Sequence, residues 1–384
     1  MRNSKRILIA PNSFKECADS SEVSLLIAKT LKEKLSSNLD KYSYQLLPLS
    51  DGGDGFLSVI ALSKDIQFLK FTIPNTLLNS QITVEVAYSV NEKIVYIESA
   101  KTIGISLVPK AEREIMKMSS YPMGLLILEL INKKKFGELD FDKIVIGIGG
   151  TGVNDFGIGM LSVFGLLLLD TLGNQLNPLP EKFEGTANIV LPEIPNDIKF
   201  EIVVDSINPL TGEKGASLIY GPQKGATINE ARALDESFIK LLKIYESYGI
   251  QRDDLVGAGG GIAAAFQLFF NAVKIDAKSF INDYLYLERA ISESDLVITG
   301  EGKVDNQNEF EKAVGIIIDS ATKQNKEIVL ICGIAENIAS SEGITVIEMS
   351  KFFNSIEGSI SNWKEGIEKS IDKMLSSIEM FRGK

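Results

Sequence analysis

Six short apolar runs, rich in β-branched residues, recur along this chain, and each ends at glycine or polar residues. The runs are residues 6–10, 93–98, 143–148, 200–205, 295–300 and 327–333. A run that is apolar throughout suits a strand buried on both faces, as in the parallel sheet of an α/β protein. Helical patterns lie between several of these runs, so we expect an α/β fold.

Helical signals are clear at both ends of the chain. Asp19 and Glu22 have the spacing of a capping box, and the apolar residues behind them form one stripe. Near the C-terminus a second stripe runs from Trp363 to Ile378 and predicts a helix that packs on the core.

The segment from 71 to 97 has a different pattern. Apolar and polar residues alternate from Ile82 to Tyr88, and a Val-Asn-Glu-Lys turn leads to a second strand, which predicts a β-hairpin. A length of 384 residues has room for two domains. We therefore expect a parallel-sheet α/β domain over 1–64 and 265–384, and an inserted mixed α/β domain over 65–264.

Histidine is absent from the 384 residues. Its absence excludes Ser-His-Asp and Cys-His catalysis and every His-ligated metal site. Cys17 and Cys332 are the only cysteines, which excludes a disulfide framework and structural zinc. Acid–base chemistry must come from carboxylates, lysines or bound water, and any metal should be a hard cation held by oxygens.

The chain is acidic, with 40 Lys and Arg against 51 Asp and Glu, a net charge of −11. This charge argues against a nucleic-acid or anionic-membrane partner, although a locally positive pocket can still bind a small anion. The longest apolar stretch, from Gly157 to Leu169, is shorter than the roughly 20 residues of a spanning helix, and the N-terminal apolar run is too short for a signal peptide. We expect a cytoplasmic protein.

Six polar, glycine-rich segments lie at or just after the expected strands, where open α/β sheets place their ligand sites. They are residues 10–15, 50–55, 147–155, 205–225, 257–261 and 295–305. Taken singly, each also has a plain structural explanation, such as a tight turn, close packing of a helix on a strand, or a charged surface loop.

The third segment matches G-x-G-x-x-G from Gly147 to Gly152, and Asp170 lies 20 residues beyond Gly150, as in a dinucleotide fingerprint. The short distance to the next apolar run leaves little room for a crossover helix. A loop that binds phosphate or substrate through backbone N–H groups explains the glycines at least as well. A nicotinamide-dependent dehydrogenase stays open as an alternative.

Together the segments favour phosphoryl transfer, which needs electrostatic clamping of phosphate and a carboxylate near the attacking hydroxyl. Neither a Walker A sequence nor the protein-kinase motif set is present. Asp205 and Asp51 are both candidates for the carboxylate that orients or deprotonates the hydroxyl, and their spacing does not choose between them.

The chain resembles the bacterial glycerate 2-kinase family from about residue 6 to about residue 335. The matching stretches, in the family's order, are APNSFK, SDGGDG, ESAKTIGISLVP, GIGGTGVNDFGIGML, DSINPLTGEKGAS, YGPQKGA, GAGGGIAAA and DLVITGEGKVDNQ. The resemblance implies two α/β domains, one of them Rossmann-like, with the active site in the cleft. It also implies a kinase that uses ATP and Mg²⁺ to phosphorylate D-glycerate to 2-phosphoglycerate, with small-molecule partners and a homodimer left open.

On this resemblance we assign roles to individual residues. The expected catalytic residues are Asp205, Asp51 and Lys15. The expected substrate-binding residues are Ser13, Lys15, Gly52, Gly53, Asn154, Asp155 and Asn208. The expected nucleotide- or phosphate-binding residues are Gly149, Gly150, Thr151, Lys224, Gly300 and Lys303. The expected Mg²⁺ ligands are Glu301 and Asp305.

Several positions depart from the family's pattern. Val153 lacks the family's hydroxyl, Phe156 replaces a glycine, and Lys303 replaces an arginine. Asn308 and Glu311 stand in place of a threonine and a small residue. Because these departures cluster in motifs, they motivate an alternative, in which the chain is a non-catalytic relative that binds glycerate or nucleotide and has a regulatory role.

Overall fold

The computed structural model describes residues 4–14, 17–50, 52–75, 80–204, 206–305, 313–336 and 342–381, except the side chains of Asn38, Leu39 and Asp305. The chain forms two compact units. Unit 1 comprises Met1–Ser50, Ser58–Lys64 and Ala277–Lys384, and unit 2 comprises Asp51–Leu57 and Asp65–Asp276. The domain boundaries expected from the sequence, at 64 and 265, stay a prediction.

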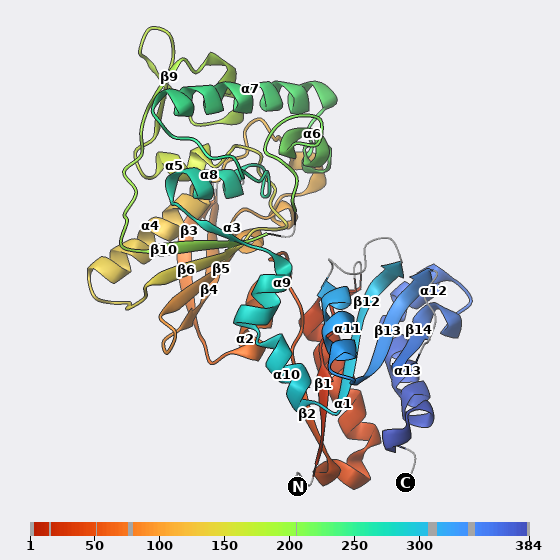
Figure 1. Ribbon diagram of the computed structural model, residues 1–384. Coiled ribbons are helices and arrows are strands. Elements are labelled where there is room, and N and C mark those ends of the chain that lie inside the picture. The colour runs from red at the N-terminus through yellow and green to blue at the C-terminus, as the bar shows by residue number, and fades with distance from the viewer. Residues whose placement is uncertain are drawn as a thin grey trace. The chain divides into compact units, whose positions relative to one another are not determined.

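Unit 1 contains a five-stranded, wholly parallel sheet with the strand order β14-β13-β12-β1-β2 (Figure 1). Its strands are β1 (Lys5–Ile9), β2 (Tyr42–Leu46), β12 (Leu296–Asp305), β13 (Glu327–Glu336) and β14 (Ile344–Glu348). Its helices are α1 (Ser20–Lys34), α9 (Ala277–Ser279), α10 (Leu287–Glu293), α11 (Ala313–Lys323), α12 (Ile356–Ser361) and α13 (Trp363–Ser377), and α2 (Phe56–Ser63) belongs mostly to this unit. Numbered along the unit, the strand order is 2-1-3-4-5, that of a doubly wound sheet.

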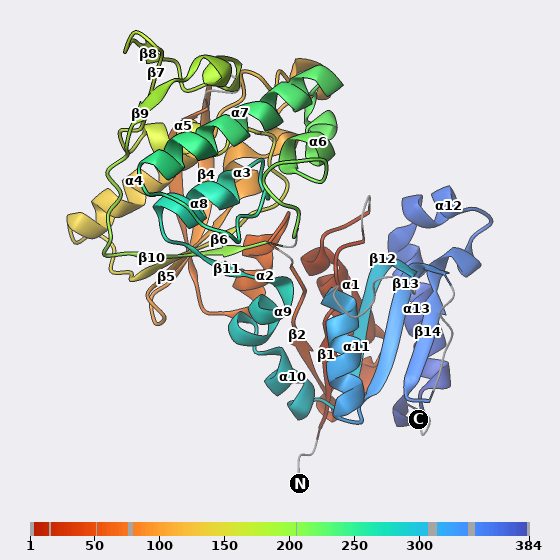
Figure 2. The ribbon, with the colours of Figure 1, turned by 45° about the horizontal axis from the view of Figure 1, so that its top comes forward.

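The predicted helices at the two ends of the chain are confirmed and share one core. Asp19 caps α1 by accepting from the backbone N–H groups of Ser21 and Glu22, and the Glu22 carboxylate accepts from the Asp19 N–H. Apolar residues of α1 and α13 pack with those of the central strands in one buried cluster. Figures 1 and 2 show α11 on the opposite face of the sheet, which is therefore covered on both sides.

The expected end of one strand is wrong. The sequence predicts a strand over 295–300 with the charged residues just past it, but β12 continues to Asp305. The reason is that β13 is equally long, so that Lys303 pairs with Ile334 and Asp305 with Glu336. Glu301 and Lys303 therefore lie two apart on an extended strand and project from the same side of it.

Unit 2 contains a six-stranded mixed sheet of order β11-β10-β6-β5-β4-β3 and a three-stranded sheet of order β8-β7-β9. The strands are β3 (Gln67–Asn75), β4 (Ser80–Ser89), β5 (Ile94–Glu98), β6 (Lys143–Gly147), β7 (Leu167–Leu169), β8 (Gln175–Leu176), β9 (Asn188–Val190), β10 (Lys199–Val203) and β11 (Val273–Ile275). The helices are α3 (Ser99–Ile103), α4 (Tyr121–Lys135), α5 (Ile158–Ser162), α6 (Ala216–Tyr220), α7 (Ile228–Ser247) and α8 (Ile262–Phe269).

The large sheet of unit 2 confirms the predicted hairpin. β4 pairs antiparallel with both β3 and β5, whereas β5, β6, β10 and β11 are parallel neighbours. One buried apolar cluster joins this sheet to the helices that cover it, including α4, α7 and α8 (Figure 2). A parallel-sheet unit and a mixed-sheet unit are the fold class expected from the sequence.

The dinucleotide-binding alternative is wrong. The glycine segment after β6 leads into α5, a helix of only five residues, and then into β7. β7 pairs antiparallel with β8 and β9 and does not join the sheet of β6. A dinucleotide fold needs a parallel βαβ unit at this point, and Asp170 instead accepts from the N–H groups of Leu172 and Asn174 in an exposed turn.

Among the residues that the structure describes, no helix combines the length and the apolar character that crossing a membrane requires.

Candidate functional site

Four neighbouring parallel strands of unit 2 end at one level. Glu98 of β5 pairs with Gly147 of β6, Gly147 pairs with Val203 of β10, and Val203 pairs with Ile275 of β11. The loops that leave these strands therefore gather at one edge of the sheet, which is where parallel α/β sheets bind ligands. This edge is the candidate site of unit 2.

Two glycine segments meet at this edge with their backbones in contact. A Cβ atom on Gly52 would lie 2.5 Å from the Val203 carbonyl oxygen, and one on Gly149 would lie 2.5 Å from Cα of Gly53. Real Cβ atoms do not approach so closely, so these positions require glycine. The structure thus brings together Gly52, Gly53 and Gly149, which the sequence places almost 100 residues apart.

The three residues assigned to catalysis, Lys15, Asp51 and Asp205, lie outside the described residues. Neighbours of two of them are described and are in contact. Gly52 directly follows Asp51, and Val203 lies two residues before Asp205. The backbone of Gly52 lies against that of Val203. The chain segments that carry the two candidate carboxylates therefore converge at the end of β10. Their catalytic roles stay a prediction.

Glu98 anchors the first of these glycine segments, and our sequence argument did not single it out. Its buried carboxylate accepts from the backbone N–H groups of Gly55 (3.2 Å) and Leu57 (3.0 Å). Burial raises the pKa of Glu98, and these two hydrogen bonds act in the opposite direction. Its neighbour Ser99 donates to the Gly149 carbonyl oxygen at 3.1 Å. The sequence signals this residue in two ways, as a carboxylate at the end of an apolar run and as the first residue of the stretch ESAKTIGISLVP.

Asp155 holds the far end of the second glycine segment. Its side chain has no exposed surface and accepts four hydrogen bonds, from the Ser120 N–H and Oγ (both 2.7 Å) and from the N–H groups of Gly157 (3.0 Å) and Gly159 (3.1 Å). Burial raises the pKa of Asp155, and the four donors oppose that shift. The carboxylate joins the start of α4 to the start of α5.

Lys224 is a buried cation next to this carboxylate. Its Nζ donates to Oγ1 of Thr151 (3.1 Å) and to the Val153 carbonyl oxygen (2.7 Å). Burial lowers the pKa of Lys224 to about 7, and the negative charge of Asp155 acts in the opposite direction. The ammonium group therefore fixes the 151–153 segment at the edge of the sheet.

Two asparagines assigned to substrate binding lie in hydrogen-bond networks with α6. Asn154 Nδ2 donates to Ser217 Oγ (3.0 Å), and its Oδ1 has no hydrogen-bond partner among the described residues. Asn208 Oδ1 accepts from the Tyr220 hydroxyl (2.7 Å) and from Ser206 Oγ (2.9 Å). The sequence gives no direct signal for Ser217 or Tyr220, because a hydroxyl on a short helix is common on any surface.

The glycine run at 257–261 serves close packing. A Cβ atom on Gly260 would lie 2.2 Å from the Val153 carbonyl oxygen, and one on Gly261 would lie 2.9 Å from Cα of Phe156. Phe156 itself is fully buried against Phe238 and Tyr245, with ring centroids 5.2 and 5.7 Å apart. This departure from the family's pattern therefore falls in the core beneath the loop.

The buried Lys224 should make folding stability depend on pH. In the unfolded chain the pKa of Lys224 is the ordinary 10.5, whereas in the folded protein it is about 7. Between these two pH values the unfolded state binds more protons than the folded state. The free energy of unfolding therefore rises with pH in this range. Below pH 7 the cost of the buried charge is present in full. In Lys224→Met this dependence is lost.

We expect the free energy of unfolding of the wild type, minus that of Lys224→Met, to increase from pH 6.5 to 9, by at most about 1.4 kcal/mol per pH unit. Urea titrations across this range measure the difference. The exposed Lys214→Met is the matched control and should run parallel to the wild type. A parallel course for Lys224→Met as well would contradict the assignment.

Unit 1 has its own candidate site, where the winding of its sheet reverses. The chain leaving β1 runs beside β12, with the Ala10 N–H donating to the Ile298 carbonyl oxygen (2.8 Å) and the Asn12 N–H to that of Gly300 (2.7 Å). Ser13 follows directly and donates its N–H to Asn12 Oδ1 (2.8 Å). Because β1 and β12 flank the topological switch point, Ser13 and Gly300 lie where doubly wound sheets bind ligands.

The charged residues that follow Gly300 are only partly described. Lys303, about half exposed, forms an ion pair with Glu336 at 2.8 Å. Among the described side chains, no group of three or more acidic or cysteine residues could hold a metal ion, and the Asp305 side chain lies outside them. Asn308 and Glu311 also lie outside the described residues.

Comparison with known proteins agrees with this geometry. The model of the glycerate kinase family matches residues 7–379, nearly the whole chain. The chain belongs to the glycerate kinase family. It is therefore an enzyme of the kinase class, and its family membership does not favour the non-catalytic alternative.

Relatives in the glycerate kinase family cover most of the chain. The glycerate kinase of Halalkalibacterium halodurans is 31% identical over 335 residues, 85% of each chain. The glycerate 2-kinase of Escherichia coli is 30% identical over 88% of this chain and 87% of its own. A crystal structure of a Salmonella typhimurium LT2 protein, described as a glycerate kinase 2, has a TM-score of 0.74 at 27% identity and covers 97% of this chain and 99% of that one.

Proposed function

We propose that this kinase transfers the γ-phosphoryl group of ATP to the 2-hydroxyl of D-glycerate, giving 2-phosphoglycerate and ADP. The observation that carries the proposal is the family match over residues 7–379, together with the convergence of the family's motifs at the strand ends of each unit. The name of the Escherichia coli relative supports the 2-hydroxyl as acceptor.

In the proposed reaction the chain's residues position and neutralise the reactants. Ser13 and Lys15 bind the substrate carboxylate, and Asp205 or Asp51 orients the hydroxyl and takes its proton. The Gly150 backbone N–H approaches phosphate oxygens, because glycine leaves the peptide accessible. Gly149 lies beside it, with its own N–H donating to Ser99 Oγ at 3.3 Å. In phosphoryl transfer such positioning and electrostatic stabilisation supply almost all of the catalysis.

The other residues of unit 2 act by holding this arrangement. Asp155, Lys224 and Glu98 are buried, and the hydrogen bonds described above tie them to the two glycine segments. We therefore propose that Asp155 and Lys224 position the loop rather than contact the substrate directly. Asn154 and Asn208 remain the proposed polar contacts of the substrate.

The donor set on β12 fits Mg²⁺. Glu301 and Asp305 supply carboxylate oxygens, the ligand type that this hard cation prefers, and Mg²⁺ commonly takes only one or two carboxylates together with substrate phosphates. Glu301 and Asp305 would hold the ion. Bound Mg²⁺ would supply charge neutralisation for the phosphate oxygens. Lys303, on the same strand and paired with Glu336, is the proposed phosphate contact.

The test is coupled detection of ADP from the purified full chain with Mg²⁺, ATP and D-glycerate, with L-glycerate and no acceptor as controls. We expect turnover that depends on D-glycerate, and a phosphorus NMR spectrum of the product that identifies the 2-phosphate ester. A folded protein that releases no ADP with D-glycerate would overturn the proposed substrate, and a 3-phosphate product would overturn the proposed acceptor position.

A further inference from the structure

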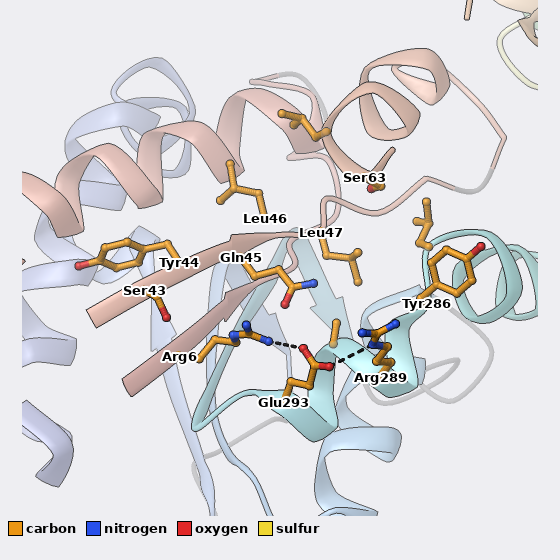
Figure 3. Close-up of a pocket in the computed structure, with 13 residues that line it drawn as sticks. Arg6, Ser43, Tyr44, Gln45, Leu46, Leu47, Ser63, Tyr286, Arg289 and Glu293 are labelled. Atoms are coloured by element: carbon orange, nitrogen blue, oxygen red, sulfur yellow. Dashed lines mark hydrogen bonds and ion pairs between the residues drawn. The ribbon is translucent and has the colours of Figure 1, made fainter. Parts of the chain in front are cut away.

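Unit 1 contains a pocket of about 480 Å³ that none of the assigned site residues lines (Figure 3). It lies beside β2, the edge strand of the sheet. Its other walls come from Arg6 of β1, from the end of α2, and from α10 with the segment before it. The volume is within the range of small-molecule sites, roughly 300 to 1,000 Å³.

The charges in the pocket are arranged around one carboxylate. Glu293 lies between two arginines, with one carboxylate oxygen paired to Arg6 and the other accepting from Arg289 Nε at 3.0 Å (Figure 3). These pairings lower the pKa of Glu293, which therefore stays ionised. The lining thus carries two positive charges and one negative charge, in a chain whose net charge is −11.

The sheet holds the polar part of the lining in place. Arg6 pairs in register with Ser43, and Leu8 with Gln45, so the side chains of Arg6, Ser43 and Gln45 project from one face of the two strands. Figure 3 shows Gln45 directed toward the same space as the two arginines. Leu47 and Leu285 add apolar surface to the wall.

A third cation lies against one of the lining residues. Tyr286 lines the pocket in a left-handed backbone conformation, φ 56°, which is uncommon for a residue other than glycine and concentrates at ligand-binding positions. Tyr286 is half exposed, and the Lys64 ammonium lies 4.8 Å from its ring centroid. Lys64 therefore adds a positive charge next to this lining residue.

We propose that this pocket is a second binding site, separate from the kinase reaction, for a small organic phosphate. Guanidinium groups recognise phosphate through paired hydrogen bonds, and an excess of positive charge in an acidic protein concentrates anions locally. Glu293 occupies the arginines when the site is empty, and the phosphate takes its place on Arg289, whose side chain is largely exposed and can reorient. The apolar wall contacts the organic part of the ligand.

Isothermal titration of the full chain with phenyl phosphate tests the site, because this probe is neither a nucleotide nor a hydroxy-acid. We expect Arg289→Gln to weaken binding about tenfold, as for loss of a charged hydrogen-bond partner. Glu293→Gln removes the competing carboxylate and should tighten binding severalfold, a gain that structural damage would not produce. Arg232→Gln, an exposed arginine on α7 of unit 2, is the matched control and should leave binding unchanged.

Three results would overturn the proposal. They are no binding by the wild type, unchanged binding by Arg289→Gln, and unchanged or weaker binding by a folded Glu293→Gln. Inorganic phosphate and phenol are the remaining arms, and each should bind more weakly than phenyl phosphate. Equal affinity for inorganic phosphate would overturn the contribution of the apolar wall.

No lining residue belongs to the proposed catalytic machinery, so glycerate-dependent turnover of Arg289→Gln should match the wild type. Failure of the second binding site can therefore be told apart from failure of the proposed function.

Discussion

Replacement of Asp205 by asparagine is expected to lower turnover by about two to four powers of ten, the contribution of a general base. The proposed physical reason is that the Asp205 carboxylate both orients the acceptor hydroxyl and takes its proton. Asp51 is the second candidate, because its neighbour Gly52 is in backbone contact with Val203, two residues before Asp205. The measurement is kcat for ADP release with D-glycerate and saturating MgATP.

Asp51→Asn separates the two candidates. If Asp205 is the base, Asp51→Asn should have the smaller effect on kcat, and the reverse order would transfer the role to Asp51. Asp197→Asn, an exposed carboxylate of unit 2, controls for a change of charge alone and should retain wild-type kcat. Full turnover in both Asp205→Asn and Asp51→Asn would refute a carboxylate base.

Replacement of Asp155 by alanine is expected to destabilise the protein by about 4 kcal/mol. The change leaves the Ser120 hydroxyl and three backbone N–H groups without their acceptor in a fully buried place, and it removes the carboxylate that lies beside the Lys224 ammonium. Unpaired buried donors cost about 1 to 3 kcal/mol each, with partial relaxation reducing the total. Urea unfolding monitored by circular dichroism measures the loss.

Two variants sharpen this measurement. Asp155→Asn keeps one acceptor oxygen but presents its amide NH₂ group to donors. We therefore expect its free energy of unfolding to lie between those of the wild type and the alanine variant. Asp197→Ala should stay within about 0.5 kcal/mol of the wild type, as surface substitutions usually do. A loss below 1 kcal/mol for Asp155→Ala would show that the four hydrogen bonds do not hold the loop.

The strands were predictable because burial on both faces leaves a pattern in the sequence. All six apolar runs form strands of the two main sheets, and the capping box at Asp19 and Glu22 opens α1 as expected. The end of β12 was not predictable. Glycine and charged residues at 300–305 are typical of a loop, but pairing with the long β13 extends the strand through them.

The sequence was sufficient to locate the segments that form the candidate site, but less so to predict the roles of their individual residues. Glycine runs at strand ends located Gly52 and Gly149, because only glycine permits the backbone contact between their segments. The burial of Asp155 and Lys224 could not be predicted, because aspartate and lysine side chains usually lie on the surface. Glu98 opens the stretch ESAKTIGISLVP, but its role was not predictable, because its partners are backbone N–H groups, which no sequence pattern distinguishes.

The pairing of β1 with β12 has a consequence for synthesis of the chain. Ile7 and Leu296 are register partners, so almost 290 residues separate the first strand from its neighbour at the centre of the sheet. At ribosomal rates of about 5 to 20 residues per second, β1 and α1 emerge roughly 15 to 60 s before that neighbour exists. During this interval only β2 can pair with β1, and the other edge of an apolar strand stays open. Nascent chains halted just before residue 296 should therefore hold an incomplete first sheet, a natural binding site for chaperones, although the last residue of unit 2, Asp276, has already been synthesised.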